Sequence, residues 1–390
     1  MRFAEVSLSA IRHNIAALRA HTGAGVIVVV KANAYGHGAA IVAPAVIAAG
    51  AEMVAVASIE EAAVLRESGF NAPILCWLHA EHLDYGAVVR LGVQLGMSSV
   101  AQLNRLAVAA RSAGTVACAQ LKLDTGLSRN GAAPDTWETL FAAAASAERA
   151  GLVRITGVFS HLANAGDAAD RAQAARFDAG VRLLRAHGVA APLRHLAASA
   201  AALSSPHLAY DAVRIGLAAF GLSPEQDGGA AVLGLRPVMT FATEIISLRW
   251  AATGAGVSEG FTHTCRRESL LAQLPVGFGD GMPRALSDTG LAVSIGGERA
   301  PVVGQIAMDE CVVDVTHLAG RALVGSRAVL FGDPAHGEPA VEEWAERLGT
   351  INYEIVAGIG PRVRRVSVDR GYPPREAPIH HSRPLREREV

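Results

Sequence analysis

Short apolar runs alternate with longer amphipathic stretches along the first 230 residues of the chain. The runs are rich in β-branched residues, with VIVVV at 26–30 as the clearest example, and the intervening stretches, such as 58–70 and 170–188, have apolar residues at helical spacing. The eight runs lie near residues 26, 53, 73, 93, 115, 154, 192 and 212. Eight strands that alternate with helices predict an α/β fold, a (β/α)8 TIM-type barrel, with a doubly wound open sheet as the alternative.

The pattern changes after about residue 235. Alternating runs at 239–250, 291–297, 311–316 and 328–332 are joined by Gly-rich turns, and only 342–349 has helical spacing. This pattern predicts a mostly antiparallel β domain. We therefore predict three parts, which are a barrel domain over 1–235, a C-terminal β domain over 236–370, and a disordered, proline-rich and charged tail over 371–390.

Composition and charge narrow the class of partner. Of the 390 residues, 51% are apolar and 18% are charged, which is typical of a globular protein. Thirty-five basic and 36 acidic residues leave a formal charge of −1, so we expect no basic surface for nucleic acid. The predicted partner is a small molecule.

Cysteine spacing and the absence of targeting patterns predict the compartment. The first 18 residues lack the apolar core of a signal peptide, and no run reaches the roughly 18 apolar residues that cross a bilayer. The four cysteines lie far apart and form no CxxC pair. Free thiols in a reducing compartment are the expected state, so we predict a cytoplasmic protein without a membrane partner.

Polar residues end several of the predicted strands, where a barrel of this kind has its active site. Lys31 directly follows VIVVV, and a desolvated amine at this place favours the neutral nucleophile that forms a Schiff base. His161, Ser199 and Arg214 follow three other runs. Each also fits a structural role, as a surface lysine, a core histidine or an arginine that pairs with a helix end.

The segment LKLDTGLSRNG carries three further charged residues. Strand alternation puts Lys122 and Asp124 on one face, and Arg129 follows in the loop. A structural ion pair beside a glycine turn and a part of the active site are both compatible with this spacing.

Seven segments together resemble one known family. They are VVVKANAYGHG, KLDTGLSRNG, GVFSHLANAGD, VRIGLAAFGLSP, LPVGFGDGMPRALS, PVVGQIAMDECVVDVT and TINYEIVAGIGPRVRRV, in this order. They resemble the alanine racemase family, whose members have fold type III and use pyridoxal 5′-phosphate (PLP). The resemblance covers about residues 1–368.

The resemblance implies a role for individual residues of the barrel. Lys31 would bind PLP covalently and act as one acid/base at the substrate Cα, and Arg214 would face the pyridine nitrogen of the cofactor. Neutral donors and main-chain N–H groups suit a phosphate dianion. The phosphate would be held by Tyr35, Ser199, Tyr353 and the backbone at Gly216.

The resemblance also implies a substrate side and a dimer. Arg129 would bind the substrate carboxylate or order the group that does, and Lys122 matches a lysine that some members carry as a carbamate. Met308 and Asp309 lie in a substrate-side loop that the partner subunit contributes. A site completed by a second chain implies a homodimer with shared active sites.

The chain departs from the family where a second base is needed. Racemisation requires acid/base groups on both faces of the planar carbanion. The family has a tyrosine in a VSYG-like segment, but this chain reads VSEG, which puts Glu259 at that position. No tyrosine lies between Tyr210 and Tyr353. The predicted catalytic set is therefore Lys31, Glu259, His161 and Arg214, and further departures from the family are Ala198, Phe278, Met282, Gln305, Ala307 and Glu310.

Three hypotheses about function follow. In the first, the chain is an amino-acid racemase, with alanine as the default substrate, in which Glu259 replaces the phenol. In the second, it performs a one-base PLP reaction such as exchange, elimination, aldol-type cleavage or decarboxylation. In the third, it binds PLP or an amino acid without turnover. His263 and Cys265 have a spacing that suits zinc, but without a third ligand we expect two exposed loop residues and no metal site.

Overall fold

The structure is a computed structural model that describes residues 2–190, 192–224 and 234–369. The predicted tail over 371–390 lies outside the described residues. Within the described part, no helix is both long enough and apolar enough to pass through a bilayer.

Eight parallel strands close into a barrel, as the sequence predicted. Closure is complete because the last strand pairs in parallel with the first, with Ile27 opposite Arg214. The strands are β2 (Gly25–Val29), β3 (Met53–Val56), β4 (Ile74–Cys76), β5 (Gln94–Met97), β6 (Ala117–Lys122), β7 (Val153–Phe159), β8 (Leu193–Ala198) and β9 (Ala212–Ile215). The open-sheet alternative is therefore wrong.

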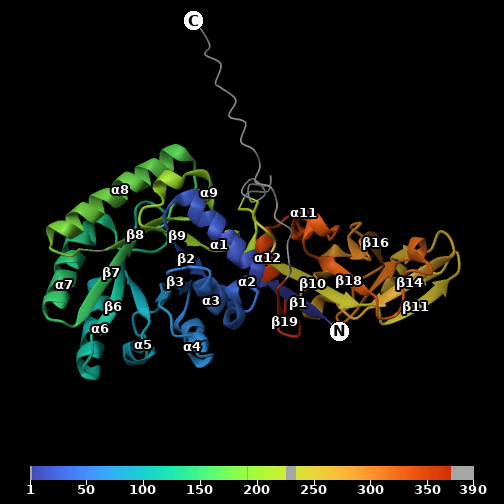
Figure 1. The fold of residues 1–390 in the computed structure, drawn as a ribbon, viewed down its shortest axis with the longest axis horizontal. Helices are drawn as coiled ribbons and strands as arrows, with labels where there is room; N and C mark the ends of the chain where they lie inside the picture. Colours follow the sequence, from blue (N-terminus) through green and yellow to red (C-terminus); the bar gives the residue numbers. More distant parts are fainter. Residues whose placement is uncertain (1, 191, 225–233, 370–390) are drawn as a thin grey trace, which may run out of the picture.

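Helices surround the barrel on its outer side (Figure 1). Four of these nine helices begin at a side chain that caps the helix. At Ser58, for example, the hydroxyl accepts from the N–H of Glu61 and the Glu61 carboxylate accepts from the Ser58 N–H. The helices of this part are α1 (Leu8–Thr22), α2 (Lys31–Tyr35), α3 (Ala39–Ala48), α4 (Ile59–Glu67), α5 (Tyr85–Leu91), α6 (Val100–Ala113), α7 (Trp137–Arg149), α8 (Asp167–Ala186) and α9 (Ser199–Ser204).

The C-terminal part is a nine-stranded sheet that extends away from the barrel (Figure 1). Its order is β11-β14-β17-β16-β15-β18-β10-β1-β19, and every pair is antiparallel except β1 with β19. The strands are β1 (Phe3–Ser7), β10 (Met239–Glu244), β11 (Ser247–Ala251), β14 (Ser269–Leu274), β15 (Ala292–Ile295), β16 (Glu298–Val303), β17 (Cys311–Asp314), β18 (Arg327–Phe331) and β19 (Arg364–Val368). The short strands β12 (Gly256–Val257) and β13 (His263–Thr264) form a separate hairpin, and two helices follow, α11 (Val341–Leu348) and α12 (Asn352–Ala357).

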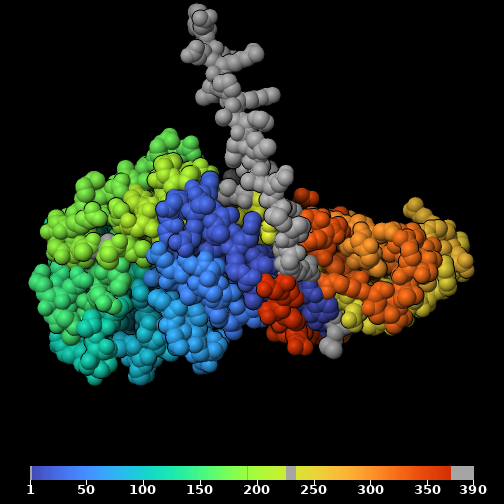
Figure 2. Space-filling model, in the orientation of Figure 1, coloured from blue at the N-terminus to red at the C-terminus, as the bar shows by residue number. Residues whose placement is uncertain are grey.

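The N-terminal strand β1 ties the two parts together. It pairs with β10 and β19, so the first residues of the chain lie in the C-terminal sheet rather than in the barrel. Figure 2 shows the dark-blue N-terminal residues beside the red C-terminal residues between the two parts. The boundary at 235/236 stays a prediction, because β1 precedes the barrel in sequence but belongs to the C-terminal sheet.

Candidate active site

Lys31 begins an unusual turn at the mouth of the barrel. The four residues after it, Ala32 to Tyr35, have φ between 51° and 55°, so the backbone makes one turn of left-handed helix. Such a conformation costs roughly 1–2 kcal/mol for each L-residue that is not glycine, so the surroundings must hold it. The N–H of Ala34 donates to the carbonyl of Val30 (2.8 Å).

Helix α12 and strand β19 close over this turn. A side chain at Gly36, which ends the turn with φ 79°, would overlap the Val356 carbonyl of α12. Arg365 of β19 donates from Nε to the Gly36 carbonyl (2.9 Å). The packing of α12 against the turn also brings Tyr353 close to Tyr35, with ring centroids 6.4 Å apart.

Tyr35, Ser199 and Gly216 form a small polar cradle. The Ser199 hydroxyl accepts from the N–H of Gly216 (3.2 Å) and, more weakly, from that of Ala218 (3.5 Å). A Cβ on Gly216 would lie 2.9 Å from Cζ of Tyr35 and closer still to its hydroxyl, so only glycine leaves room here for the phenol. Burial, then the nearby Tyr353, raises the pKa of Tyr35, which keeps it a neutral donor.

Arg214 is buried at the end of β9 without a carboxylate partner among the described residues. Its guanidinium donates to two imidazoles and three carbonyls: from Nη1 to Nδ1 of His195 (3.0 Å) and its carbonyl (3.0 Å), and from Nη2 to the Ser160 carbonyl (2.6 Å), Nδ1 of His161 (3.0 Å) and the Leu196 carbonyl (3.1 Å). Nε makes no hydrogen bond within the described ranges. It is therefore the one guanidinium nitrogen available to a ligand.

A hydrogen-bonded chain inside the barrel fixes the state of His195. Arg214 only donates, so Nδ1 of His195 must be the acceptor and Nε2 must carry the proton. Nε2 then donates to Oε1 of Gln120 (2.6 Å), whose amide donates to Oε1 of Gln94 (3.0 Å), which also accepts from Thr156 (2.7 Å). Burial, then Arg214, lowers the pKa of His195 well below its usual range. His195 is thus a neutral imidazole in one tautomer.

Positive charge gathers at the barrel mouth. Burial, followed by the charges of Arg214 and Arg129, lowers the pKa of Lys122 to about 8 and that of His161 to about 3. Burial and then Arg129 lower the pKa of Arg214 to about 9 and also that of Lys31. Because the charge of Arg129 acts on the other four groups, the loop after β6 lies within electrostatic reach of all of them.

Phe159, at the end of β7, is the apolar floor of this cluster. The His195 ring stacks on it at 4.9 Å, while Nζ of Lys122 and Cζ of Arg214 lie 5.7 and 5.4 Å from its centroid. An aromatic face attracts cations and keeps water away from them. The floor therefore both holds and desolvates two of the charged groups.

Glu259 and Met308 lie apart from the barrel residues. Both are exposed in the C-terminal part, Met308 by 54%, and no hydrogen bond or ion pair joins either to the barrel site in the described chain. Glu259 lines a cavity of about 320 Å³ together with Arg249, Gln305 and Glu310. This cavity borders β11 and β14, at the end of the sheet farthest from the barrel (Figure 1).

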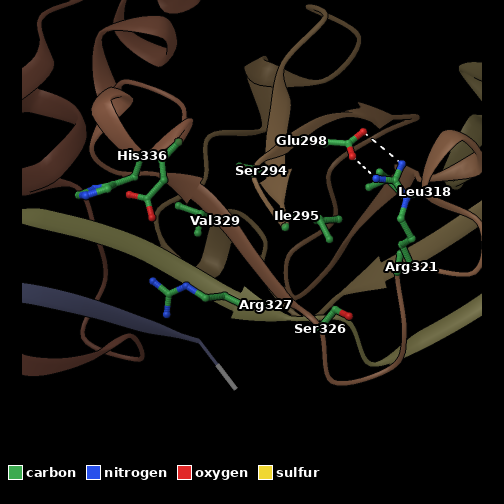
Figure 3. Close-up of a pocket in the computed structure, with 13 residues that line it drawn as sticks. Ser294, Ile295, Glu298, Leu318, Arg321, Ser326, Arg327, Val329 and His336 are labelled. Atoms are coloured by element: carbon green, nitrogen blue, oxygen red, sulfur yellow. Dashed lines mark hydrogen bonds and ion pairs between the residues drawn. The ribbon is translucent and has the colours of Figure 1, made fainter.

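Two other places do not form a site. Cys265, expected to be exposed, is buried at 1% exposure in a small apolar cluster, and no group of three or more His, Cys, Asp or Glu suited to a metal occurs in the described part of the chain. A cavity of about 420 Å³ lies beside β15, β16 and β18 (Figure 3). Its cations are already compensated, with Arg321 paired to Glu298 and Arg327 to Glu5.

Gln120, His195 and Glu61 hydrogen-bond to groups of the site but were not predicted from the sequence. Gln120 and His195 lie within strands that are otherwise mostly apolar. A single sequence does not show whether a polar residue in such a strand points into the barrel or belongs to a strand end. Glu61 was readable in part, because Ser58 and Glu61 have the spacing of a capping box. Its contact with the Lys31 turn depends on the fold.

Together the fold and the site define a barrel enzyme that presents a desolvated lysine beside a cradle of neutral hydrogen-bond donors. Residues 6–224 match the family model for the alanine racemase N-terminal domain, and 238–367 match that for the C-terminal domain. The chain therefore belongs to the alanine racemase family. This membership confirms the class of enzyme, a PLP-dependent isomerase, and the cofactor that the resemblance implied.

Similar proteins cover almost the whole chain. The alanine racemase of Salinispora arenicola is 42% identical over 358 residues, which are 91% of this chain and 95% of that protein. That of Thermobifida fusca is 42% identical over 367 residues, 93% of this chain and 97% of that protein. The solved structure of alanine racemase from Streptomyces coelicolor A3(2) superposes with a TM-score of 0.87 at 41% identity, covering 95% of this chain and 98% of that one.

Proposed function

We propose that this chain is a PLP-dependent amino-acid racemase that acts on alanine, as a cytoplasmic homodimer with shared active sites. One observation carries the proposal. The groups suited to hold the cofactor converge at one barrel mouth, whereas the candidate second base, Glu259, is exposed in the C-terminal part. Here the barrel, over 1–235, provides the cofactor site, and the β domain, over 236–370, completes the site of the other subunit.

The residues present fit PLP. The Gly216 N–H and the hydroxyls of Ser199, Tyr35 and Tyr353 provide neutral donors for the phosphate, in a cradle that a Cβ at Gly216 would fill. Nε of Arg214 is free to donate to the pyridine nitrogen. PLP, once bound, supplies an electron-withdrawing ring that stabilises negative charge at the substrate Cα.

Arg214 stays a hydrogen-bond donor rather than an acid. Its pKa, lowered by burial only to about 9, leaves the guanidinium charged at neutral pH. The imidazoles of His195 and His161 are neutral and accept hydrogen bonds from Arg214, so neither takes its proton. Arg214 would therefore hold the pyridine nitrogen through a hydrogen bond and keep its own proton.

Lys31 would move the proton on one face of Cα. Burial and the charge of Arg129 lower the pKa of its amine, so a larger share is neutral and able to accept a proton than in a solvated lysine. Arg129 itself would attract the substrate carboxylate.

Glu259 of the partner would act on the opposite face. Nδ1 of His161 accepts from Arg214, and a pKa near 3 keeps the ring neutral, so its proton lies on Nε2. An N–H at Nε2 suits a carboxylate acceptor as well as a phenol. We therefore assign Glu259 as the second base, with His161 as its donor and Met308 as the apolar wall beside the substrate.

Lys122 is a candidate for carbamylation. A pKa of about 8 leaves an appreciable neutral fraction, and only a neutral amine adds to carbon dioxide. The resulting negative charge would face Arg129 and Arg214, whose charges now depress the pKa of Lys122.

Complementation between two inactive variants tests the shared site. Lys31→Ala and Glu259→Gln chains are each expected to lack racemase activity as homodimers. In mixed dimers one of the two sites receives both native residues, so co-expression should restore about a quarter of wild-type activity. Glu268→Gln, which changes an exposed glutamate of the same domain, is the matched control and should keep full activity.

Each outcome decides one part of the proposal. Full activity of Glu259→Gln alone would remove Glu259 as the base. Two inactive variants that never complement would argue against a site shared between subunits. Exchange of the Cα proton without inversion would favour a one-base PLP reaction, and no reaction with any amino acid would favour a binding protein.

A further inference from the structure

Glu61 connects two loops at the mouth of the barrel. Its carboxylate is half-buried on the first turn of α4 and accepts three backbone hydrogen bonds. Oε2 accepts from the N–H groups of Ala57 (2.8 Å) and Ser58 (3.4 Å), and Oε1 accepts from the N–H of Ala32 (2.6 Å). The loop after β2 is thereby tied to the loop after β3.

The contact with Ala32 exceeds what helix capping requires. A capping box needs only the reciprocal bonds between Ser58 and Glu61. The bond to Ala32 instead reaches the first residue of the left-handed turn, directly after Lys31. A bond to an ionised carboxylate is roughly twice as strong as a neutral one, which suits a strained segment.

The first residue of the turn, Ala32, otherwise has a backbone bond, because its carbonyl accepts from the Gly36 N–H (2.9 Å). Later residues are fixed by Asn33, whose Oδ1 accepts from the Ala39 N–H (2.8 Å), and by the contacts of Gly36 with α12 and β19. Among the described residues, Glu61 is the only side chain that hydrogen-bonds to the backbone of Lys31 or Ala32. Among side chains of the described residues, one carboxylate therefore holds the backbone at the start of the turn.

We propose that Glu61 is the positioning residue that holds the left-handed turn and so aims Lys31 at the cofactor. This inference rests on the proposed role of Lys31. The geometry requires a carboxylate, because an amide in this place would present an NH2 group to at least one of the three N–H donors.

The charge of Glu61 acts on the same amine. Burial and Arg129 lower the pKa of Lys31, whereas Glu61 raises it. Removing the negative charge at position 61 therefore lowers this pKa further, so the amine becomes reactive at a lower pH. A purely structural cap of α4 would not affect the titration of Lys31.

Two measurements on the cofactor-free protein test the proposal. Hydrogen exchange with mass spectrometry reports the amides of residues 31–37, and acetylation of Lys31 as a function of pH, mapped by mass spectrometry, reports its pKa. Glu61→Gln should accelerate exchange in this segment by roughly tenfold or more, as expected for a lost charge-assisted bond, and should shift the acetylation profile to lower pH.

Two variants serve as matched controls. Ser58→Ala breaks the other half of the capping box and leaves the carboxylate in place, so it should loosen α4 without changing residues 31–37. Glu60→Gln removes an adjacent but fully exposed charge and should change neither readout. If Glu61→Gln fails to fold, Glu61→Asp keeps the charge on a shorter side chain and should show the faster exchange with a smaller shift in acetylation.

The results separate this inference from the proposed function. Exchange and acetylation in Glu61→Gln that match Ser58→Ala would overturn the role of Glu61. Retention of the lysine-bound PLP absorption in Lys31→Ala would instead overturn the role of Lys31, whatever the exchange of the turn shows.

Discussion

Replacing Gly216 with alanine tests the phosphate cradle most sharply. The added Cβ would lie 2.9 Å from Cζ of Tyr35, whereas ordinary carbon contacts begin at about 3.4 Å. The ring must therefore retreat by at least half an ångström, and its hydroxyl by more, because the hydroxyl is the closer atom. The three atoms nearest to the added Cβ all belong to Tyr35.

The size of the effect follows from one displaced donor. A hydrogen bond to a charged group contributes about 1.5–3 kcal/mol, so a misplaced Tyr35 hydroxyl should weaken PLP binding by roughly 10- to 100-fold. Overpacking should also lower the free energy of unfolding by about 1–3 kcal/mol. Tyr35→Phe removes the same hydroxyl without overpacking and should weaken binding to a similar extent.

Titration of the cofactor-free protein with PLP, followed by absorbance, measures the affinity. Gly86→Ala, within helix α5 and with only the flexible Asp84 and Arg90 side chains near the added Cβ, is the control and should bind PLP normally. Unchanged PLP affinity in Gly216→Ala would refute the assignment of the phosphate site to this cradle. Weak binding in Gly216→Ala together with normal binding in Tyr35→Phe would show that the Tyr35 hydroxyl is not the displaced group.

Two further predictions concern the interior of the barrel. Gln120→Leu leaves the Nε2 proton of His195 without an acceptor, so the free energy of unfolding should fall by about 1–3 kcal/mol. Because Arg214 still donates to Nδ1, ¹⁵N spectra should show that His195 keeps its proton on Nε2, and a change of tautomer would disprove the assignment to Arg214. Burial and Arg214 hold the pKa of Lys122 near 8, below the usual 10.5, so the unfolded chain binds more protons between these values and stability in buffer free of carbon dioxide should rise with pH from about 8 to 10.5. Urea unfolding should show this rise in the native protein and a smaller rise in Lys122→Met, in which the lowered pKa values of Lys31 and Arg214 still contribute.

The barrel was readable from the sequence because each of its strands is a compact apolar run. VIVVV and the seven similar runs need no partner to be recognised, since strands buried on both faces are apolar throughout. The C-terminal strands at 239–250 and 311–316 were equally clear. By contrast, β1 was missed: FAEVS reads as a short leading segment, and its partners β10 and β19 lie more than 200 residues away.

Only those residues of the site that lie in recognisable motifs were predictable from the sequence. Lys31, Arg214 and Ser199 followed from strand ends and the family resemblance, and the structure brings these groups to one barrel mouth. The left-handed turn was not predictable, because Ala32 and Ala34 have no intrinsic preference for positive φ and adopt it only under tertiary contacts. Glu259 could be assigned to a motif position, but its distance from its own barrel depends on the fold.

The proton at Cα gives the most direct test of the central claim, that Lys31 and the partner's Glu259 act on opposite faces of one substrate. The PLP-loaded enzyme is incubated with L-alanine in deuterium oxide, and the products are separated by chiral chromatography and analysed by mass spectrometry. We expect D-alanine that carries one solvent deuterium at Cα. L-alanine that gains deuterium while no D-alanine forms would contradict the two-base racemase and leave Lys31 acting alone.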